Sequence, residues 1–246
     1  MTAIDDASDG AASRAPIAVV GTGTDVGKTV VTAGLTRWLR EQGYDTRAIK
    51  PAQTGHPPDD DAGFVGEACG NPDAATCPRY LEPALAPRIA AEVAEEALSY
   101  DRILEACERE IATTDLPVVE GIGGLRVPLA GDREVIDLVA DLEATAVVVT
   151  RSGLGTLNHT ALTVTALERR GVDVLGIVCN EYAGATLAER TNPAELERMT
   201  GCAVETVPPL RDDNTTAADT TPEALAIGVS ESLSSSFLER LEGVGT

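Results

Sequence analysis

The stretch Gly21-Thr22-Gly23-Thr24-Asp25-Val26-Gly27-Lys28-Thr29 decides the fold. An apolar run, residues 16–20, leads into it, and a helical pattern, residues 30–39, leads out. The backbone N–H groups of a glycine loop and the positive end of the following helix together favour a bound phosphate group. The Lys28 ammonium adds a charge for the terminal phosphates, and the Thr29 hydroxyl is the usual Mg²⁺ ligand of such loops. The stretch therefore predicts a phosphate-binding loop between a strand and a helix.

The glycine spacing departs from the usual motif. That motif places a glycine six residues before the lysine, where this chain has Thr22. Gly21 and Gly23 stand on either side of that position. A glycine-rich turn without a phosphate role is the alternative, and the flanking strand and helix favour the phosphate loop.

Lys50 is the second residue that the sequence singles out. The chain has two lysines, Lys28 and Lys50, against seventeen arginines. An ammonium is a compact point charge that the planar guanidinium of arginine does not replace. Residues 46–50 are predicted to form a strand, and ligands of an open α/β sheet bind at the carboxyl ends of its strands. We therefore expect Lys50 and the loop of residues 51–55 near the phosphate loop. The alternative is a strand-end lysine that extends to solvent.

Composition limits the classes of function. The 246 residues suit one α/β domain, and a hydrophobic content of 43% is enough for a packed core. The net charge of −21, from 40 acidic and 19 basic residues, argues against nucleic acid or an anionic membrane as a partner. Such an acidic, lysine-poor surface predicts a protein of a high-salt cytoplasm, because salt screens the self-repulsion.

The cysteines and the N-terminal segment indicate a cytoplasmic protein. The five cysteines are odd in number and never spaced as Cys-x-x-Cys, which indicates free thiols in a reducing compartment. Residues 1–15 are polar and acidic, so we expect a disordered tail and not a signal peptide. We find no stretch long enough and apolar enough to span a bilayer.

Apolar runs alternate with helical patterns along the chain. Strands are predicted over residues 16–20, 46–50, 116–120, 145–150, 172–179 and 203–207. Helices are predicted over residues 28–42, 62–68, 100–111, 134–142, 156–170 and 222–241. The proline-containing segment of residues 81–90 is predicted to lead into a short helix, and loops are predicted over residues 69–80 and 211–221. The alternation predicts a single-domain α/β P-loop NTPase fold over residues 16–246, with a mostly parallel sheet and helices on both faces.

Two carboxylates are candidate magnesium ligands. Asp61 ends the run Asp59-Asp60-Asp61 before a predicted helix, so it either caps that helix or approaches the metal of a bound nucleotide. Glu120 ends a predicted strand and precedes Gly121-Ile122-Gly123-Gly124, where glycines allow a ligand close to the backbone. An acidic residue there is typical of a metal-binding carboxylate in phosphate-loop enzymes, and the alternative is an ordinary strand-end residue before a turn.

Two further polar residues lie near the ends of later strands. Asn180 follows the strand of residues 172–179 and either contacts an adenine edge or stabilises a turn. His159 falls in the first turn of a predicted helix, and we interpret it as a capping or packing group and not as a general base.

Six segments, in the same order along the chain, resemble the ATP-dependent dethiobiotin synthetase family. They are the phosphate loop, residues 50–55 (Lys-Pro-Ala-Gln-Thr-Gly), Asp61-Ala62, residues 82–91, residues 119–124 (Val-Glu-Gly-Ile-Gly-Gly) and residues 153–160. The resemblance covers about residues 16 to 210. Gly23, Arg88 and Glu181 stand where the family often has other residues. The Gly-Lys-Thr alone is unspecific, whereas six segments in order are specific.

The resemblance implies a ligase that uses ATP and Mg²⁺ to join CO₂ to 7,8-diaminononanoate and to close the ureido ring of dethiobiotin. It implies catalytic roles for Lys28 and Lys50, contact of Thr54 with the diamine, and metal coordination by Thr29, Asp61 and Glu120. The residues that it implies at ATP are Asp25, Val26, Gly27, Lys28, Thr29, Val30, Asp61, Glu120, Gly121, Ile122, Gly123, Asn180, Glu181, Pro208, Pro209 and Leu210.

The resemblance also implies a second subunit. Members of the family are homodimers, and Gly155, Thr156 and Asn158 of the partner subunit would meet the substrate carboxylate. A helix N-terminus suits such an anion.

Two other classes of protein share parts of this pattern. A ParA/MinD-like ATPase switch carries an extra lysine within its phosphate loop, where this chain has Thr22, Gly23 and Thr24. A cobyrinate-type amidoligase usually brings a glutaminase domain with a nucleophilic cysteine, for which this chain lacks the length.

Overall fold

The computed structural model describes residues 15–210 and 220–244. Nearly all of the predicted N-terminal tail and of the predicted loop over residues 211–221 lies outside the described residues. Within those two ranges, no helix is both long enough and apolar enough to cross a membrane.

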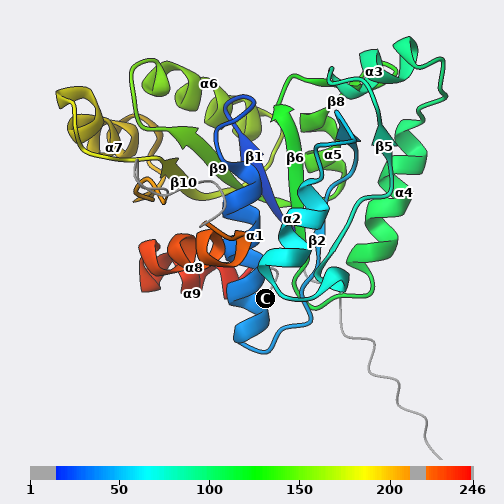
Figure 1. Ribbon diagram of the computed structural model, residues 1–246. Coiled ribbons are helices and arrows are strands. Elements are labelled where there is room, and N and C mark those ends of the chain that lie inside the picture. Colours follow the sequence, from blue (N-terminus) through cyan, green and yellow to red (C-terminus); the bar gives the residue numbers. More distant parts are fainter. Residues whose placement is uncertain (1–14, 211–219, 245–246) are drawn as a thin grey trace, which may run out of the picture.

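A seven-stranded parallel sheet forms the centre of the molecule, with the strand order β11-β10-β9-β1-β6-β2-β4 (Figure 1). Its strands are β1 (Ile17–Gly21), β2 (Ala48–Ile49), β4 (Ala75–Thr76), β6 (Val118–Gly124), β9 (Thr145–Arg151), β10 (Val174–Asn180) and β11 (Val204–Thr206). Because β1 lies between β6 and β9, the phosphate loop leaves the sheet near its middle. Ligands of open α/β sheets bind at such a change of strand order.

Most of the helices lie between strands of this sheet along the chain, and α8 (Pro222–Ser232) and α9 (Ser235–Glu242) follow its last strand. The others are α1 (Lys28–Glu41), α2 (Asp61–Ala68), α3 (Pro87–Val93), α4 (Tyr100–Ile111), α5 (Val135–Asp141), α6 (Thr156–Arg169), α7 (Leu187–Thr200) and the 3-10 helix η1 (Pro72–Ala74). Two small sheets pair β3 (Gln53–Thr54) with β5 (Tyr80–Leu81) and β7 (Pro128–Ala130) with β8 (Arg133–Glu134).

The alternation of side chains along β1 divides the core into two layers. Ile17 and Val19 pack in a cluster with residues of α1, α8 and α9, whereas Ala18 and Val20 pack in a cluster that α5, α6 and α7 cover. Figure 1 shows α8 and α9 beside α1, on one side of the sheet. The predicted parallel sheet with helices on both faces is therefore confirmed.

Several predicted boundaries are confirmed by the local hydrogen bonds. The hydroxyl of Ser99 accepts a hydrogen bond from the backbone N–H of Arg102 and caps α4, as predicted. Glu134 caps α5, where its side chain and that of Asp137 form a reciprocal capping box. α1 begins at Lys28, the residue that the phosphate-loop motif predicted.

Four regions differ from the prediction. Helix α7 was not predicted, although Thr186 and Glu189 form a capping box at its start, because Pro193 interrupts its pattern. Residues 69–80, predicted as a loop, contain η1 and the edge strand β4. The hairpin of β7 and β8 was not predicted. The C-terminal helical region is two helices, since Ser234 accepts a hydrogen bond from the N–H of Phe237 and starts α9.

Candidate active site

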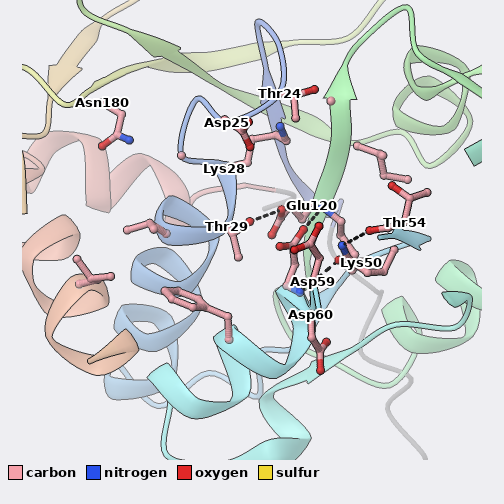
Figure 2. Close-up of a pocket in the computed structure, with 18 of the residues that line it drawn as sticks. Thr24, Asp25, Lys28, Thr29, Lys50, Thr54, Asp59, Asp60, Glu120 and Asn180 are labelled. Atoms are coloured by element: carbon pink, nitrogen blue, oxygen red, sulfur yellow. Dashed lines mark hydrogen bonds and ion pairs between the residues drawn. The ribbon is translucent and has the colours of Figure 1, made fainter. Parts of the chain in front are cut away.

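A cavity of about 690 Å³ opens at the carboxyl ends of β1, β2 and β6 (Figure 2). This volume is in the range of about 300–1,000 Å³ that small-molecule sites occupy. The residues that line it are Thr24, Asp25, Gly27, Lys28, Thr29, Val30, Lys50, Gln53, Thr54, Pro58, Asp59, Asp60, Asp61, Phe64, Glu120, Ile122, Gly123, Asn180, Glu181, Pro209, Leu210 and Leu225. The cavity thus joins the phosphate loop to residues from five other segments of the chain.

The phosphate loop ends on Gly27, which has a left-handed φ of 97° and precedes α1 without a side-chain cap. A methyl group at Gly27 would lie 2.0 Å from Nδ2 of Asn180, so only glycine fits. That amide donates a hydrogen bond to the carbonyl of Val26 at 3.1 Å. Asn180 therefore holds the loop from β10, and its side chain lines the same cavity as the first turn of α1.

Lys28 is 7% exposed, and its ammonium donates a hydrogen bond to the carbonyl of Gly23 at 3.0 Å across the loop. Burial lowers the pKa of Lys28, and the nearby ammonium of Lys50 lowers it further. An anion that binds in the loop would offset both effects, because it stabilises the charged form of each lysine.

Lys50 is buried between two carboxylates. Its Nζ lies 2.8 Å from Oε1 of Glu120 and 2.5 Å from Oδ2 of Asp61. Burial disfavours the charged ammonium, but the two carboxylates outweigh burial and raise the pKa of Lys50. Lys50 therefore favours its positively charged form inside the cavity.

The two carboxylates experience different surroundings. Burial raises the pKa of Glu120, whose side chain is 2% exposed. Burial also opposes ionisation of Asp61, but the Lys50 ammonium prevails there and lowers the pKa of that carboxyl. Of the two carboxylates, Glu120 contributes more than Asp61 to the raised pKa of Lys50.

Asp61 does not cap α2, which corrects one of the two interpretations of that residue. Asp60 is the N-cap, since its carboxylate accepts a hydrogen bond from the N–H of Gly63 at 2.9 Å. Asp61 is the first residue of the helix and turns its side chain toward Lys50. Gln53 accepts a hydrogen bond from the Asp61 N–H at 3.2 Å and fixes this start of the helix.

The oxygen atoms around Lys50 fit a magnesium ion. The Thr29 hydroxyl donates a hydrogen bond to Oε1 of Glu120 at 2.9 Å, and Asp61 lies on the other side of the same ammonium. One hydroxyl and two carboxylates are the hard oxygen donors that Mg²⁺ prefers, and it completes its shell with phosphate oxygens and water. In the part of the chain that the structure describes, no group of three or more His, Cys, Asp or Glu side chains could hold a metal.

Most of the predicted ATP residues line this one cavity, and a few do not. Among the described residues, Val26, Gly121 and Pro208 are absent from its lining. The predicted partner-subunit residues Gly155, Thr156 and Asn158 also lie outside the cavity of their own chain. Gly155 and Asn158 are exposed at the start of α6, and Thr156 is buried there.

His159 is exposed on α6, and the N-cap of that helix is Gly155 without a side-chain cap hydrogen bond, so the interpretation as a capping or packing group is not confirmed in either part. Its ring lies beside Gly155, where a methyl group would be 3.5 Å from Cε1 of His159. The residue is outside the cavity that holds Lys50.

Some residues of the cavity were missed by the sequence analysis. Phe64 from α2 and Leu225 from α8 add apolar walls. Gln53 belongs to the loop of residues 51–55 that was expected here, but its support of the start of α2 was not predicted. Phe64 had a local signal, because it lies close to Asp61. Leu225 had no local signal in the sequence, because only the packing of α8 against α1 brings it to the cavity.

Known proteins share both the sequence and the fold. A family model described as an AAA domain matches residues 16–214. The ATP-dependent dethiobiotin synthetase BioD of Haloferax mediterranei is 63% identical over 193 residues, which cover 78% of this chain and 83% of that protein. The enzyme of the same name from Aquifex aeolicus is 32% identical over 195 residues, which cover 79% and 89%.

Solved structures agree on the fold. A ParA family ATPase from Chlorobium tepidum is similar with a TM-score of 0.58 and 12% identity, covering 95% of this chain and 100% of that chain. The septum site-determining protein MinD of Pyrococcus horikoshii, complexed with Mg-ADP, is similar with a TM-score of 0.53 and 15% identity, covering 87% and 93%. Likeness at this level of identity concerns the fold alone. The sequence relatives define the family, and by them this chain belongs to the ATP-dependent dethiobiotin synthetases.

Proposed function

We propose that this protein is a ligase of biotin biosynthesis that carboxylates 7,8-diaminononanoate with CO₂ and closes the ureido ring of dethiobiotin at the expense of ATP. One observation carries the proposal: a buried ammonium, Lys50, lies within hydrogen-bond distance of two carboxylates next to a phosphate loop. Phosphoryl transfer needs charge neutralisation and alignment more than covalent help from the protein. The relatives supply the acceptor, because they are dethiobiotin synthetases.

ATP would bind across the start of α1. The phosphate loop and Lys28 would hold the β- and γ-phosphates. Asn180 and the segment Pro208–Leu210 would hold the adenine. Support comes from the cavity, which extends from the phosphate loop to Asn180, Pro209 and Leu210.

Mg²⁺ would be held by Thr29, Asp61 and Glu120, directly or through water. When bound, it neutralises charge on the phosphate oxygens. The same carboxylate oxygens contact Lys50. Lys50 and the metal therefore compete for these oxygens, and a lysine displaced from them can turn toward a substrate anion.

The reaction is proposed in three steps. One amine of the substrate attacks CO₂ and loses a proton, which gives a carbamate. A carbamate oxygen then attacks the γ-phosphorus, ADP leaves, and a carbamic-phosphoric mixed anhydride forms. The second amine attacks the carbamoyl carbon and loses a proton, the bond to the phosphate oxygen breaks, and phosphate leaves as the ring closes.

Two residues have proposed roles in these steps. Lys50 would stabilise the carbamate and the phosphoryl group in transfer, because an ammonium in a dry site acts strongly on developing negative charge. Thr54 would contact the diamine or its carbamate. Thr54 lies on β3, a few residues after Lys50, and lines the cavity.

The remaining assignments concern the assembly and the compartment. We propose a homodimer in which Gly155, Thr156 and Asn158 of the partner subunit meet the substrate carboxylate. Gly155 and Asn158 are exposed at the N-terminus of α6, which suits this role. We propose a cytoplasmic location, in keeping with the five free cysteines.

The ATPase-switch alternative is not favoured. The ParA and MinD structures share the fold at 12% and 15% identity, whereas the dethiobiotin synthetase of Haloferax mediterranei is 63% identical. The sequence also has no lysine at Thr22, Gly23 or Thr24.

A coupled assay tests the proposal. Purified protein is mixed with 7,8-diaminononanoate, bicarbonate, ATP and Mg²⁺, in molar KCl and in dilute buffer, and dethiobiotin and phosphate are followed together. Equal, diamine-dependent formation of both is expected. Phosphate release that ignores the diamine would overturn the proposal and favour the ATPase switch. Full stability in dilute buffer would contradict the high-salt interpretation of the acidic surface.

A further inference from the structure

A ring of buried hydroxyl groups lies between the phosphate loop and the first turn of α6. The hydroxyl of Thr150, at the end of β9, is 2.8 Å from that of Thr156 and 3.0 Å from that of Thr160. The hydroxyls of Thr156 and Thr160 are 3.3 Å apart, which closes the ring. The Thr150 hydroxyl is also 3.1 Å from the hydroxyl of Thr22, in the phosphate loop. Thr150 is therefore the one member of the ring that contacts both segments.

The hydroxyl groups of the ring are buried, so the loss of one of these hydrogen bonds costs free energy. Thr150 is 1% exposed, Thr156 is 4% and Thr160 is 0%, so water does not replace a lost partner. Each hydroxyl has a single proton to donate. Thr160 donates to Thr150, which leaves Thr150 one proton for either Thr156 or Thr22. The hydrogen bond at Thr22 and the direction of hydrogen bonding in the ring are consequently linked.

Backbone contacts fix the end of β9 to the phosphate loop. The N–H of Thr22 donates to the carbonyl of Val149 at 3.0 Å, and the guanidinium of Arg151 donates to the carbonyl of Asp25 at 2.8 Å. A displacement of the phosphate loop thus acts on Thr150 through residues on both sides of it.

The loop before α6 is held from its other side by α7. The Asn192 amide donates to the carbonyls of Ser152 and Gly153 at 2.8 and 3.1 Å. Leu154, at the tip, is 94% exposed. The threonine ring therefore holds the start of α6 on its buried side, while the tip of the preceding loop is exposed to solvent.

We propose that Thr150 is a positioning residue that couples nucleotide binding at the phosphate loop to the first turn of α6. A nucleotide fixes the phosphate loop, the Thr22 hydroxyl then holds Thr150, and the closed ring orders the backbone of residues 155–160. A further consequence rests on the proposed function: ATP bound to one subunit would order the first turn of its α6, which contacts the diamine bound to the other subunit. The coupling itself needs only nucleotide binding.

Hydrogen exchange of backbone amides tests the coupling on the full chain. Exchange at residues 155–160 is measured by mass spectrometry with Mg²⁺ alone and with Mg²⁺ plus the non-hydrolysable β,γ-methylene ATP. The variants are Thr150→Val, which removes the hydroxyl, and Thr150→Ser, which keeps it. Thr32→Val is the matched control, because the buried Thr32 hydroxyl on α1 has no hydrogen-bond partner among the residues that the structure describes.

The nucleotide is expected to slow exchange at residues 155–160 in the wild type, in Thr150→Ser and in Thr32→Val. In Thr150→Val we expect this slowing to fall by about twofold to tenfold, which corresponds to the loss of one buried hydrogen bond. Unchanged slowing in Thr150→Val, no slowing in the wild type, or an equal loss in Thr32→Val would each overturn the proposal.

A second variant serves if Thr150→Val does not fold. Thr22→Ala removes the hydroxyl that links the loop to the ring, at a half-buried position; with nucleotide added to saturation, which a binding titration of this variant establishes, it should give the same loss of slowing. Binding without that loss would overturn the proposal equally. Dethiobiotin formation by the wild type is measured separately, so failure of the proposed reaction and failure of the coupling remain distinguishable.

Discussion

The turn from β1 to α1 and the turn from β9 to α6 both end on a left-handed glycine, Gly27 with φ 97° and Gly155 with φ 89°. Neither helix has a side-chain N-cap, so both turns present backbone N–H groups at a helix N-terminus. The residue after the glycine is the buried Lys28 in the first turn and Thr156 in the second. The same backbone conformation thus occurs at two different places. The turn at Gly27 carries a charged residue in the cavity, whereas the turn at the exposed Gly155 is followed by an uncharged residue. The side chains around each turn, and not the turn itself, decide how strongly it acts on an anion.

The largest expected effect comes from removing a charge near the first turn. Lys50→Met keeps the length of the side chain and should leave nucleotide binding largely intact. The loss of one well-placed charge in a dry site costs about 3–4 kcal/mol of barrier, so kcat should fall on the order of 10²–10³. Steady-state rates of dethiobiotin formation measure this. Arg47→Met is the control, because Arg47 pairs with Glu110 outside the cavity. A kcat of Lys50→Met near that of the wild type would remove the role given to this lysine.

The two glycines provide a second, matched pair of variants. Gly155→Ala should cost about 1–2 kcal/mol of unfolding free energy, because its φ is left-handed and the nearest atom, 3.5 Å away, leaves room for a methyl group. Gly27→Ala should cost about 1–3 kcal/mol more, since its methyl group would lie 2.0 Å from Asn180. Urea unfolding of both variants measures the difference between the two losses of unfolding free energy. Equal costs would show that Asn180 moves away freely and does not constrain the phosphate loop.

The helices that follow the two turns differ in their buried threonines. Thr160 on α6 belongs to the hydroxyl ring, whereas Thr36 on α1 is equally buried and has no hydrogen-bond partner within residues 15–210 and 220–244. Thr160→Val should cost about 1–3 kcal/mol of unfolding free energy, because it leaves buried hydroxyls without a partner. Thr36→Val should be close to neutral or stabilising. Thermal and urea unfolding measure both, and a loss in Thr36→Val as large as that in Thr160→Val would contradict the distinction.

The smallest expected effect concerns the dependence of stability on pH. The pKa of Asp61 is lower in the folded protein than its ordinary value of 3.8: burial opposes this shift, Lys50 lowers the pKa most, and hydrogen bonds with Thr29 and Glu120 add to the lowering. Its ionised form therefore stabilises the fold above about pH 4, and this contribution is lost as the pH falls through the lowered pKa. The difference in unfolding free energy between the wild type and Asp61→Asn should be full at pH 7 and shrink below pH 4. In a Lys50→Met background most of the pH-dependent part should disappear, and its undiminished persistence there would show that Lys50 is not the main group that lowers the pKa of Asp61.

Much of the fold could be predicted because its signals are local. The phosphate loop, the strand before it and the helix after it are contiguous residues whose spacing alone indicates the structure. Lys50 and Glu120 were identified because each stands where a predicted strand meets a loop. Helix α7 was missed because Pro193 obscures its pattern, and β4 because two residues give no periodicity.

The sequence by itself determined the parts of the site: a phosphate loop, two lysines in an arginine-rich chain, and acidic residues at strand ends. Only the tertiary structure decided their partners. Glu120 reaches Lys50 across 70 positions of the chain because β6 lies beside β2, and Thr22 reaches Thr150 across 128 because β1 lies beside β9. Side-chain periodicity reports only which face of its own element a residue occupies. The order of the strands, which follows from packing two layers of helices on one sheet, sets which strand ends become neighbours.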